Sequence, residues 1–167
     1  MKMKKLSVLM LLIFTSVFVN AQKKGTDWLK LGVHAGIPVA DTKDTSSFAL
    51  GVDAKYQFLD LKSFGLGIAT GYTNYFKKDD NKNVGIIPVA ALLRYYPTKR
   101  FFVGADLGVG VTFLKDETKA GFYYRPELGY HDDEWNAFLF YQGDAIKDAN
   151  IGAIGIGVNY NILRPMK

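Results

Sequence analysis

Residues 101–113 alternate without a break between apolar side chains and small or polar ones, and this pattern restricts the fold more than any other feature of the chain. The apolar side chains occupy every second position: Phe101, Val103, Ala105, Leu107, Val109, Val111 and Phe113. Successive side chains of a β-strand point to opposite faces, so one face of this segment is apolar and the other is small and polar. A strand needs about 9–11 residues to cross a bilayer at a tilt, with its apolar face toward lipid. The segment therefore predicts a membrane-spanning strand.

The same alternation recurs along the chain, in segments separated by turn-like residues. We expect eight strands, at residues 28–37, 48–58, 64–76, 84–96, 101–114, 121–130, 136–143 and 151–162. Pro126 lies in the sixth of these and has no N–H to donate, which predicts a bulge or a local break there. The pattern leaves the register of the seventh strand open. The predicted fold is all-β, an eight-stranded antiparallel up-and-down transmembrane β-barrel.

The segments between the predicted strands fall into two alternating sets. One set comprises residues 60–63, 98–100 and 131–135, and the other, longer on average, comprises residues 38–47, 77–83, 115–120 and 144–150. Short turns at one end and longer loops at the other are typical of outer-membrane barrels, with the loops outside and both termini in the periplasm. Aromatic side chains gather at the turn end, Trp28 and Tyr95 among them, and at the loop end, which predicts two girdles at the membrane–water boundaries.

The first 21 residues have the order of charge, apolar stretch and small residues that is typical of a secretory signal. Three lysines precede an apolar stretch at residues 6–19, which is too short to span a bilayer as a helix. We expect cleavage after Ala21, which leaves residues 22–167 as the barrel domain. Cleavage leaves 18 of the 21 basic residues against 16 acidic ones, a formal charge of only +2. We therefore expect no nucleic-acid partner.

Six charged residues fall on the face that is predicted to point inward. They are Asp53, Lys55, Arg94, Asp106, Arg125 and Glu127. Buried charges without partners are very costly, so we expect this interior charge network to pair within itself or with trapped water. The pattern does not tell which charges pair. The interior of an eight-stranded barrel is only wide enough for side chains, which favours a plug over the alternative of a charge-lined pore or proton relay.

No arrangement of catalytic or metal-binding residues stands out in the sequence. His34 is expected alone on the inward side of the first strand. His131 precedes three acidic residues at 132–134, which we interpret as a solvated turn rather than a cation site. The serines of the mature chain all lie in predicted connectors, and none neighbours a histidine that could act as its base. We expect no metal, no cofactor and no enzyme; an enzyme would require His34 to be functional.

A soluble exported barrel of the lipocalin type, holding a small apolar ligand, is the alternative to the membrane barrel. In that fold the apolar face points inward and charges such as Asp53 and Lys55 face water, so no charge has to be buried. Against it, the polar face of the strands is rich in glycine rather than in solvating side chains. The two interpretations predict opposite directions for the same side chains.

Three short patterns connect the chain with a known group of proteins. They are Ile87-Pro88 followed by Leu93-Arg94-Tyr95-Tyr96-Pro97, then Phe102-Val103-Gly104-Ala105, and a glycine-rich final strand. In these patterns the chain resembles the small outer-membrane β-barrel proteins of the OmpA/OmpX kind, in the version common in Bacteroidetes, over residues 22–162. The resemblance implies a barrel in the cell outer membrane and no particular activity.

The function expected from these features is a structural or surface-interaction role for a non-catalytic outer-membrane barrel. Its partners would be the outer-membrane lipid and extracellular molecules that reach the loops. We expect a monomer.

Overall fold

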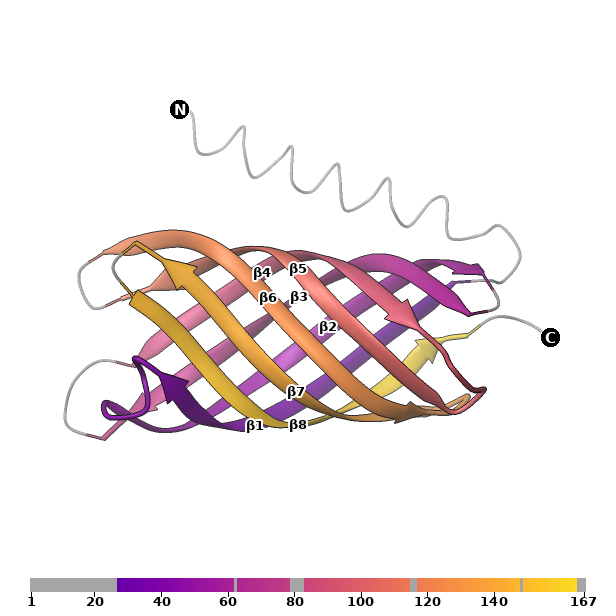
Figure 1. Cartoon of the computed structure of the whole chain (residues 1–167), viewed down its shortest axis with the longest axis horizontal. Helices are drawn as coiled ribbons and strands as arrows, with labels where there is room; N and C mark the ends of the chain where they lie inside the picture. Colours follow the sequence, from indigo (N-terminus) through magenta and orange to yellow (C-terminus); the bar gives the residue numbers. More distant parts are fainter. Residues whose placement is uncertain (1–26, 62, 79–82, 115–116, 148, 165–167) are drawn as a thin grey trace, which may run out of the picture.

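The described residues of this computed structural model form a closed antiparallel β-barrel. The structure describes residues 27–61, 63–78, 83–114, 117–147 and 149–164, so the predicted signal at residues 1–21 lies outside it. Eight strands follow in chain order: β1 (Trp28–Ala40), β2 (Ser46–Leu61), β3 (Phe64–Lys77), β4 (Val84–Tyr95), β5 (Phe101–Phe113), β6 (Thr118–His131), β7 (Trp135–Ile146) and β8 (Ala149–Leu163). Each strand pairs with its neighbours in sequence, and β1 closes the ring against β8 (Figure 1). The predicted fold class is confirmed.

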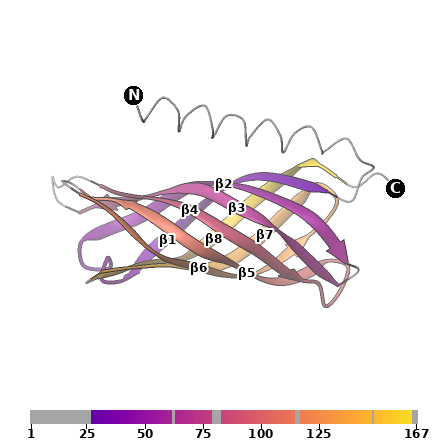
Figure 2. The same ribbon diagram turned by 90° about the horizontal axis from the view of Figure 1, so that it is seen from above.

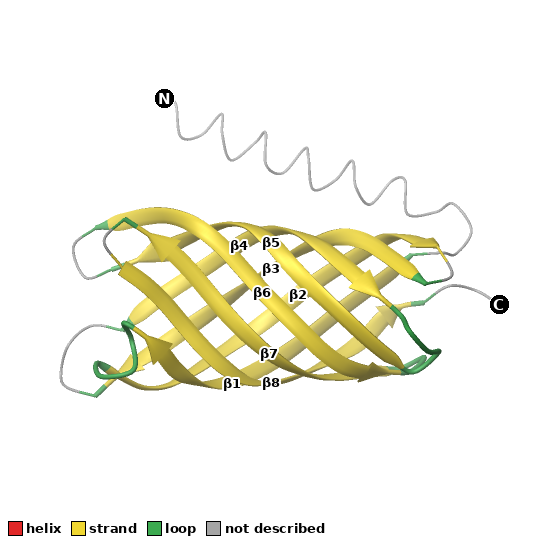
Figure 3. Ribbon diagram, viewed as in Figure 1, coloured by secondary structure: helices red, strands yellow, loops and turns green. Residues whose placement is uncertain are grey.

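Connectors lie at the two ends of this ring of tilted strands, as two views at right angles show (Figures 2 and 3). β1 begins and β8 ends at the same end of the barrel, on the right in Figure 1, which we call the turn end; the opposite end is the loop end. Within the described ranges no helix is long and apolar enough to cross a membrane.

The apolar faces of the strands point outward. On β5 the side chains of Val103, Leu107 and Val109 are 38–51% exposed, whereas Phe102 and Asp106, on the other face, are almost fully buried. The same alternation runs along the other strands, so a belt of aliphatic side chains surrounds the barrel. This arrangement is the reverse of the one required by a soluble lipocalin-like barrel, and it excludes that alternative.

The strands are long enough to cross a bilayer. The shortest, β4 and β7, each contain 12 residues. At about 3.3 Å per residue and a tilt of about 40°, such a strand advances about 30 Å along the barrel axis. The apolar band of an outer-membrane barrel is about 25 Å tall, so each strand can span it.

The strands extend further at the loop end than the sequence predicted. The connector expected at residues 38–47 is reduced to residues 41–45, and the one expected at 144–150 is reduced to 147–148. The reason is that pairing between neighbouring strands continues further than expected. β1, for example, pairs with β8 as far as Ala40. The expected contrast between short turns and longer loops is therefore weak in this barrel.

Neighbouring strands decide the register of β7, which the sequence left open. β7 pairs with β6 on one side and β8 on the other, and both ladders direct Phe138, Phe140 and Gln142 inward. Leu139, on the outer face, is 59% exposed. The interior of the barrel thus receives two phenylalanine rings that the sequence pattern alone did not assign to it.

Pro126 in β6 interrupts the pairing with β7 and leaves the pairing with β5 intact. It lies opposite Ala105 of β5. On the other side, the β6–β7 pairs stop at Tyr124 and resume at Glu127 in an unchanged register. The predicted local break is confirmed on this side, without the additional residue of a bulge, because proline has no N–H to donate.

Aromatic side chains form a girdle at each end of the barrel, in stacked, tilted or edge-to-face pairs. The pairs are Phe64–Tyr95, Phe101–Tyr130 and Trp135–Tyr160 at the turn end, and Phe48–Phe76 at the loop end. Phe122 and Tyr124 stack on each other further along β6, opposite Val109 and Leu107, because β6 already begins at Thr118. Trp28 was predicted to belong to the turn-end girdle, and this is wrong. Its side chain is buried and turned into the mouth of the barrel, because Trp28 has the same parity on β1 as the inward residues Lys30 and His34.

Candidate functional site

The six charged residues of the predicted network all lie inside the barrel, and each is at most 6% exposed. They come from four strands: Asp53 and Lys55 from β2, Arg94 from β4, Asp106 from β5, and Arg125 and Glu127 from β6. The register brings several of them together, because Asp106 is directly opposite Arg125 in the β5–β6 ladder. The site therefore lies at mid-length on one side of the interior and reaches across to β2.

Glu127 is the anion that contacts all three cations of the network. Its Oε1 atom lies 2.5 Å from Lys55 Nζ and 3.1 Å from Arg125 Nε, and its Oε2 atom accepts a hydrogen bond of 2.7 Å from Arg94 Nη2. The Arg125 Nε contact is an ion pair without hydrogen-bond geometry. Removing this one carboxylate would therefore affect three buried positive charges at once.

The two aspartates complete the network. Asp53 accepts two hydrogen bonds from the Arg125 guanidinium, of 2.8 Å and 3.2 Å, in a two-pronged arrangement that favours arginine over lysine. Asp106 lies 2.8 Å from Lys55 Nζ and 3.0 Å from Arg94 Nη1. Three cations and three anions are thus joined in one connected cluster, which offsets the high cost of removing each charge from water.

Aromatic rings inside the barrel pack against the cations. The Arg125 guanidinium carbon lies 4.2 Å from the centre of the Phe140 ring, and that of Arg94 lies 5.2 Å from the Phe102 ring. Lys55 Nζ lies 5.1 Å from the centre of the Phe138 ring. A cation over a ring face gains about 0.5–2 kcal/mol, more when it is shielded from water. The sequence pattern did not reveal these contacts, because two of the three rings come from β7, the strand whose register the sequence left open.

Gly104 makes room for the side chain of Arg94. It is directly opposite Arg94 in the β4–β5 ladder. A Cβ atom at this position would lie 2.5 Å from Arg94 Nη1 and 2.6 Å from Arg94 Cδ. A larger residue would therefore displace the guanidinium from Asp106 and Glu127.

His34 is not alone on the inner face, contrary to the prediction from the sequence. Its Nδ1 atom lies 3.0 Å from Asp53 Oδ2, and its Nε2 atom lies 3.0 Å from Thr73 Oγ1. A hydroxyl, an imidazole and a carboxylate joined in this order match the hydrogen bonds of a nucleophilic triad. Thr73, however, is 2% exposed and also bonds to Gln142, so a substrate would have no access to the hydroxyl. His34 extends the charge network instead.

Two further buried charges were missed in the sequence analysis. Lys30 of β1 is 4% exposed, and its Nζ atom donates a hydrogen bond of 3.5 Å to Asn136 Oδ1. The alternation of β1 would have revealed it, because Lys30 shares its parity with His34. Asp144 was predicted to lie in a connector, but β7 continues past it, and the carboxylate is buried and accepts a hydrogen bond from Thr112.

The acidic segment after His131 forms a tight turn, in agreement with the sequence interpretation. Asp132 Oδ1 accepts hydrogen bonds from the backbone N–H groups of Glu134, at 2.8 Å, and Trp135, at 2.7 Å. These two donors lower the pKa of Asp132 below its ordinary value. Among the described residues, no group of three or more His, Cys, Asp or Glu side chains could hold a metal ion.

Comparison with solved structures identifies the architecture. The structure of Ail from Yersinia pestis with the heparin analogue sucrose octasulfate superimposes with a TM-score of 0.63 at 15% identity, over 84% of this chain and 100% of that one. The outer membrane protein Ail of Yersinia pestis in a phospholipid nanodisc gives 0.54 at 15% identity, over 80% and 99%. The N-terminal β-barrel domain of Pseudomonas aeruginosa OprF gives 0.56 at 12% identity, over 80% and 97%.

The fold is that of a small outer-membrane β-barrel. Identities this low establish the fold alone, and they agree with the resemblance noted in the sequence. No family model matches the chain, and no curated protein sequence matches it.

Proposed function

We propose that this chain is a non-catalytic barrel protein of the cell outer membrane, with a structural or surface-interaction role and an interior plugged by paired charges. The observation that carries the proposal is the distribution of side chains: an aliphatic belt outside, and the connected cluster of Asp53, Lys55, Arg94, Asp106, Arg125 and Glu127 inside. Lipid is the medium that matches such an exterior. Residues 1–21 are the proposed export signal.

Surface contacts, in this proposal, are made at the loop end, which faces outward when both termini lie in the periplasm. The connectors there are short, so a partner would contact the rim of the barrel together with residues such as Lys43 and Lys78. These two are already close, because Lys78 Nζ donates a hydrogen bond of 3.0 Å to the Lys43 carbonyl oxygen. The proposed lack of catalysis is supported by the burial of Thr73 and His34, a hydrogen-bonded pair that resembles a nucleophile and its base.

We expect the expressed protein in the outer-membrane fraction, with faster gel migration before boiling than after it, because a closed barrel of this kind resists unfolding by detergent. Membrane fractionation and heat-modifiability measure this. As a control for orientation, an epitope tag in the 41–45 connector should be labelled on intact cells, whereas a tag at residues 132–134 should not. Release of the protein with soluble periplasmic material would contradict the proposal.

We also expect no large conductance from the refolded protein, because eight strands enclose an interior that side chains fill. Planar-bilayer recording measures this directly. A matched experiment on the Glu127→Gln variant tests whether the ion cluster contributes to the closure. Stable water-filled channels formed by the unsubstituted monomer would show that the plug interpretation is wrong.

A further inference from the structure

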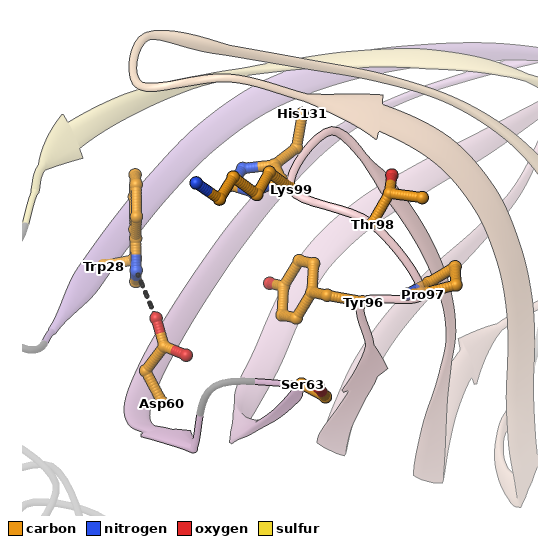
Figure 4. Close-up of a pocket in the computed structure, with 8 residues that line it drawn as sticks. All are labelled: Trp28, Asp60, Ser63, Tyr96, Pro97, Thr98, Lys99 and His131. Atoms are coloured by element: carbon orange, nitrogen blue, oxygen red, sulfur yellow. Dashed lines mark hydrogen bonds between the residues drawn. The ribbon is translucent and has the colours of Figure 1, made fainter.

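A pocket of about 370 Å³ opens at the turn end of the barrel, outside the charge network. Its walls include Trp28 of β1, Asp60 of β2, His131 of β6, and Tyr96 and Lys99 of the β4–β5 connector (Figure 4). No residue of the six-charge cluster lines it. Its volume lies within the range of small-molecule sites, about 300–1,000 Å³. The proposed function leaves this pocket without a role.

Aromatic rings form the apolar walls of the pocket. The centre of the His131 ring lies 5.7 Å from that of Trp28, in edge-to-face contact, and 5.1 Å from that of Tyr96. Trp28 is only 8% exposed, so its orientation is held by its neighbours. In Figure 4 the Trp28 and Tyr96 rings stand on opposite sides of the opening. The Tyr96 and His131 rings are half-buried, so a ligand with a flat apolar face can contact them without rearranging the buried Trp28.

Polar atoms point into the same space. Asp60 accepts a hydrogen bond of 3.3 Å from the Trp28 indole N–H through Oδ2 (Figure 4). The Tyr96 hydroxyl donates to Gln57 Oε1 at 2.9 Å and keeps its capacity to accept. Two buried nitrogen atoms, His131 Nδ1 and Gln57 Nε2, have no hydrogen-bond partner among the described residues. Such atoms are rare in native structures, and one of the two belongs to His131, which lines the pocket.

The charges around the pocket are of both signs, so they do not select a strongly charged ligand. An anion would meet the Asp60 carboxylate. A cation would meet the Lys99 ammonium and, behind Trp28, the buried Lys30, whose Nζ atom lies 5.4 Å from the Trp28 ring centre. A neutral ligand that offers many hydroxyl or amide groups around a flat apolar face suits both the rings and the polar atoms.

We propose that the turn-end pocket binds a saccharide. The C–H face of a pyranose ring packs on Tyr96 beside Trp28, one hydroxyl or amide N–H donates to Asp60, and His131 Nδ1 and Lys99 contact the remaining polar groups. The source of the sugar rests on the proposed function. If the turn end faces the periplasm, the accessible glycan is that of the cell wall, whose sugars are N-acetylated. The binding itself does not depend on that orientation.

The two tryptophans of the chain make a direct test possible, because only Trp28 lies in the pocket. Trp135 is 50% exposed on the outer girdle and can be replaced by phenylalanine. The mature Trp135→Phe protein, folded in detergent micelles, is titrated with N-acetylglucosamine trisaccharide and, separately, with maltotriose, while Trp28 fluorescence is recorded. We expect a saturable change with the N-acetylated sugar at millimolar concentration or below, and a weaker response to maltotriose.

The Asp60→Asn substitution should weaken binding about tenfold or more, the effect of losing a hydrogen bond to a charged group. Glu134→Gln, at the same mouth but outside the pocket, is the matched control and should leave binding unchanged. Ligand-detected saturation-transfer NMR on the unsubstituted chain repeats the measurement without any variant. Equal binding of both sugars would support the saccharide site and overturn the cell-wall source. Absence of binding to either sugar, or binding that Asp60→Asn leaves intact, would overturn the site, whereas fractionation tests the membrane location separately.

Discussion

Arginine in place of Leu107 is expected to impair insertion of the barrel severely. Leu107 lies at the middle of β5, on the outer face, opposite Ala91 of β4 and Tyr124 of β6. A lipid-facing arginine near the bilayer midplane costs about 2–4 kcal/mol. A loss of that size is a large part of the stability of a typical protein, about 5–15 kcal/mol. Refolding into lipid vesicles, followed by a urea titration of the folded fraction, measures the effect.

The same substitution at the end of the same strand face provides the control. Phe113 belongs to the outer face of β5 at the loop end, and arginine near the membrane boundary costs only about 0–1 kcal/mol beyond the lost ring contacts. The urea midpoint of Leu107→Arg should therefore fall well below that of Phe113→Arg. Equal midpoints would mean that the outer face does not meet hydrocarbon, and would contradict the membrane-spanning assignment.

Replacing Glu127 by glutamine is expected to lower the free energy of unfolding by about 3–5 kcal/mol, the typical loss when one partner of a buried ion pair is removed. The amide keeps the shape of the carboxylate but removes the charge that faces Lys55, Arg94 and Arg125. The three cations would then share two aspartates inside a medium that solvates charge poorly. Equilibrium urea unfolding in vesicles, with equal m-values for the parent and the variant, measures the loss.

Glu134→Gln is the matched control for this prediction. Glu134 forms an exposed ion pair with Arg164 at 3.6 Å, and exposed pairs of this kind contribute about 0–1 kcal/mol. If Glu127→Gln loses no more stability than Glu134→Gln, the interior carboxylate is not the common partner of the cations. Water inside the barrel would then have to solvate the three cations in place of the Glu127 carboxylate.

The barrel architecture could be read from the sequence because strand alternation is a local property. Every second side chain of a strand faces the same way, so the direction of Leu107 and Asp106 follows from their neighbours along the chain alone. The inward position of Arg94 and the outward position of Ile87 follow from the same rule. The inward direction of Trp28 follows from this rule too, because it shares its parity with Lys30 and His34. Two features at strand ends were predicted incorrectly: the location of Asp144 and the length of the loop-end connectors. Strand ends depend on whether a neighbouring strand continues to pair, which is not encoded locally.

Contacts between strands, in contrast, were decided by the tertiary structure. The sequence placed six charges inside, but only the closing of the ring brings Lys55 of β2 to Glu127 of β6, and Phe140 of β7 to Arg125. His34 acquires Asp53 and Thr73 as partners by the same closure. The turn-end pocket collects residues from three strands and from two connectors, β2–β3 and β4–β5, and no short pattern joins them. Alternation along a strand depends on neighbouring residues, whereas an ion pair or a pocket depends on distances through space that exist only once the barrel has closed.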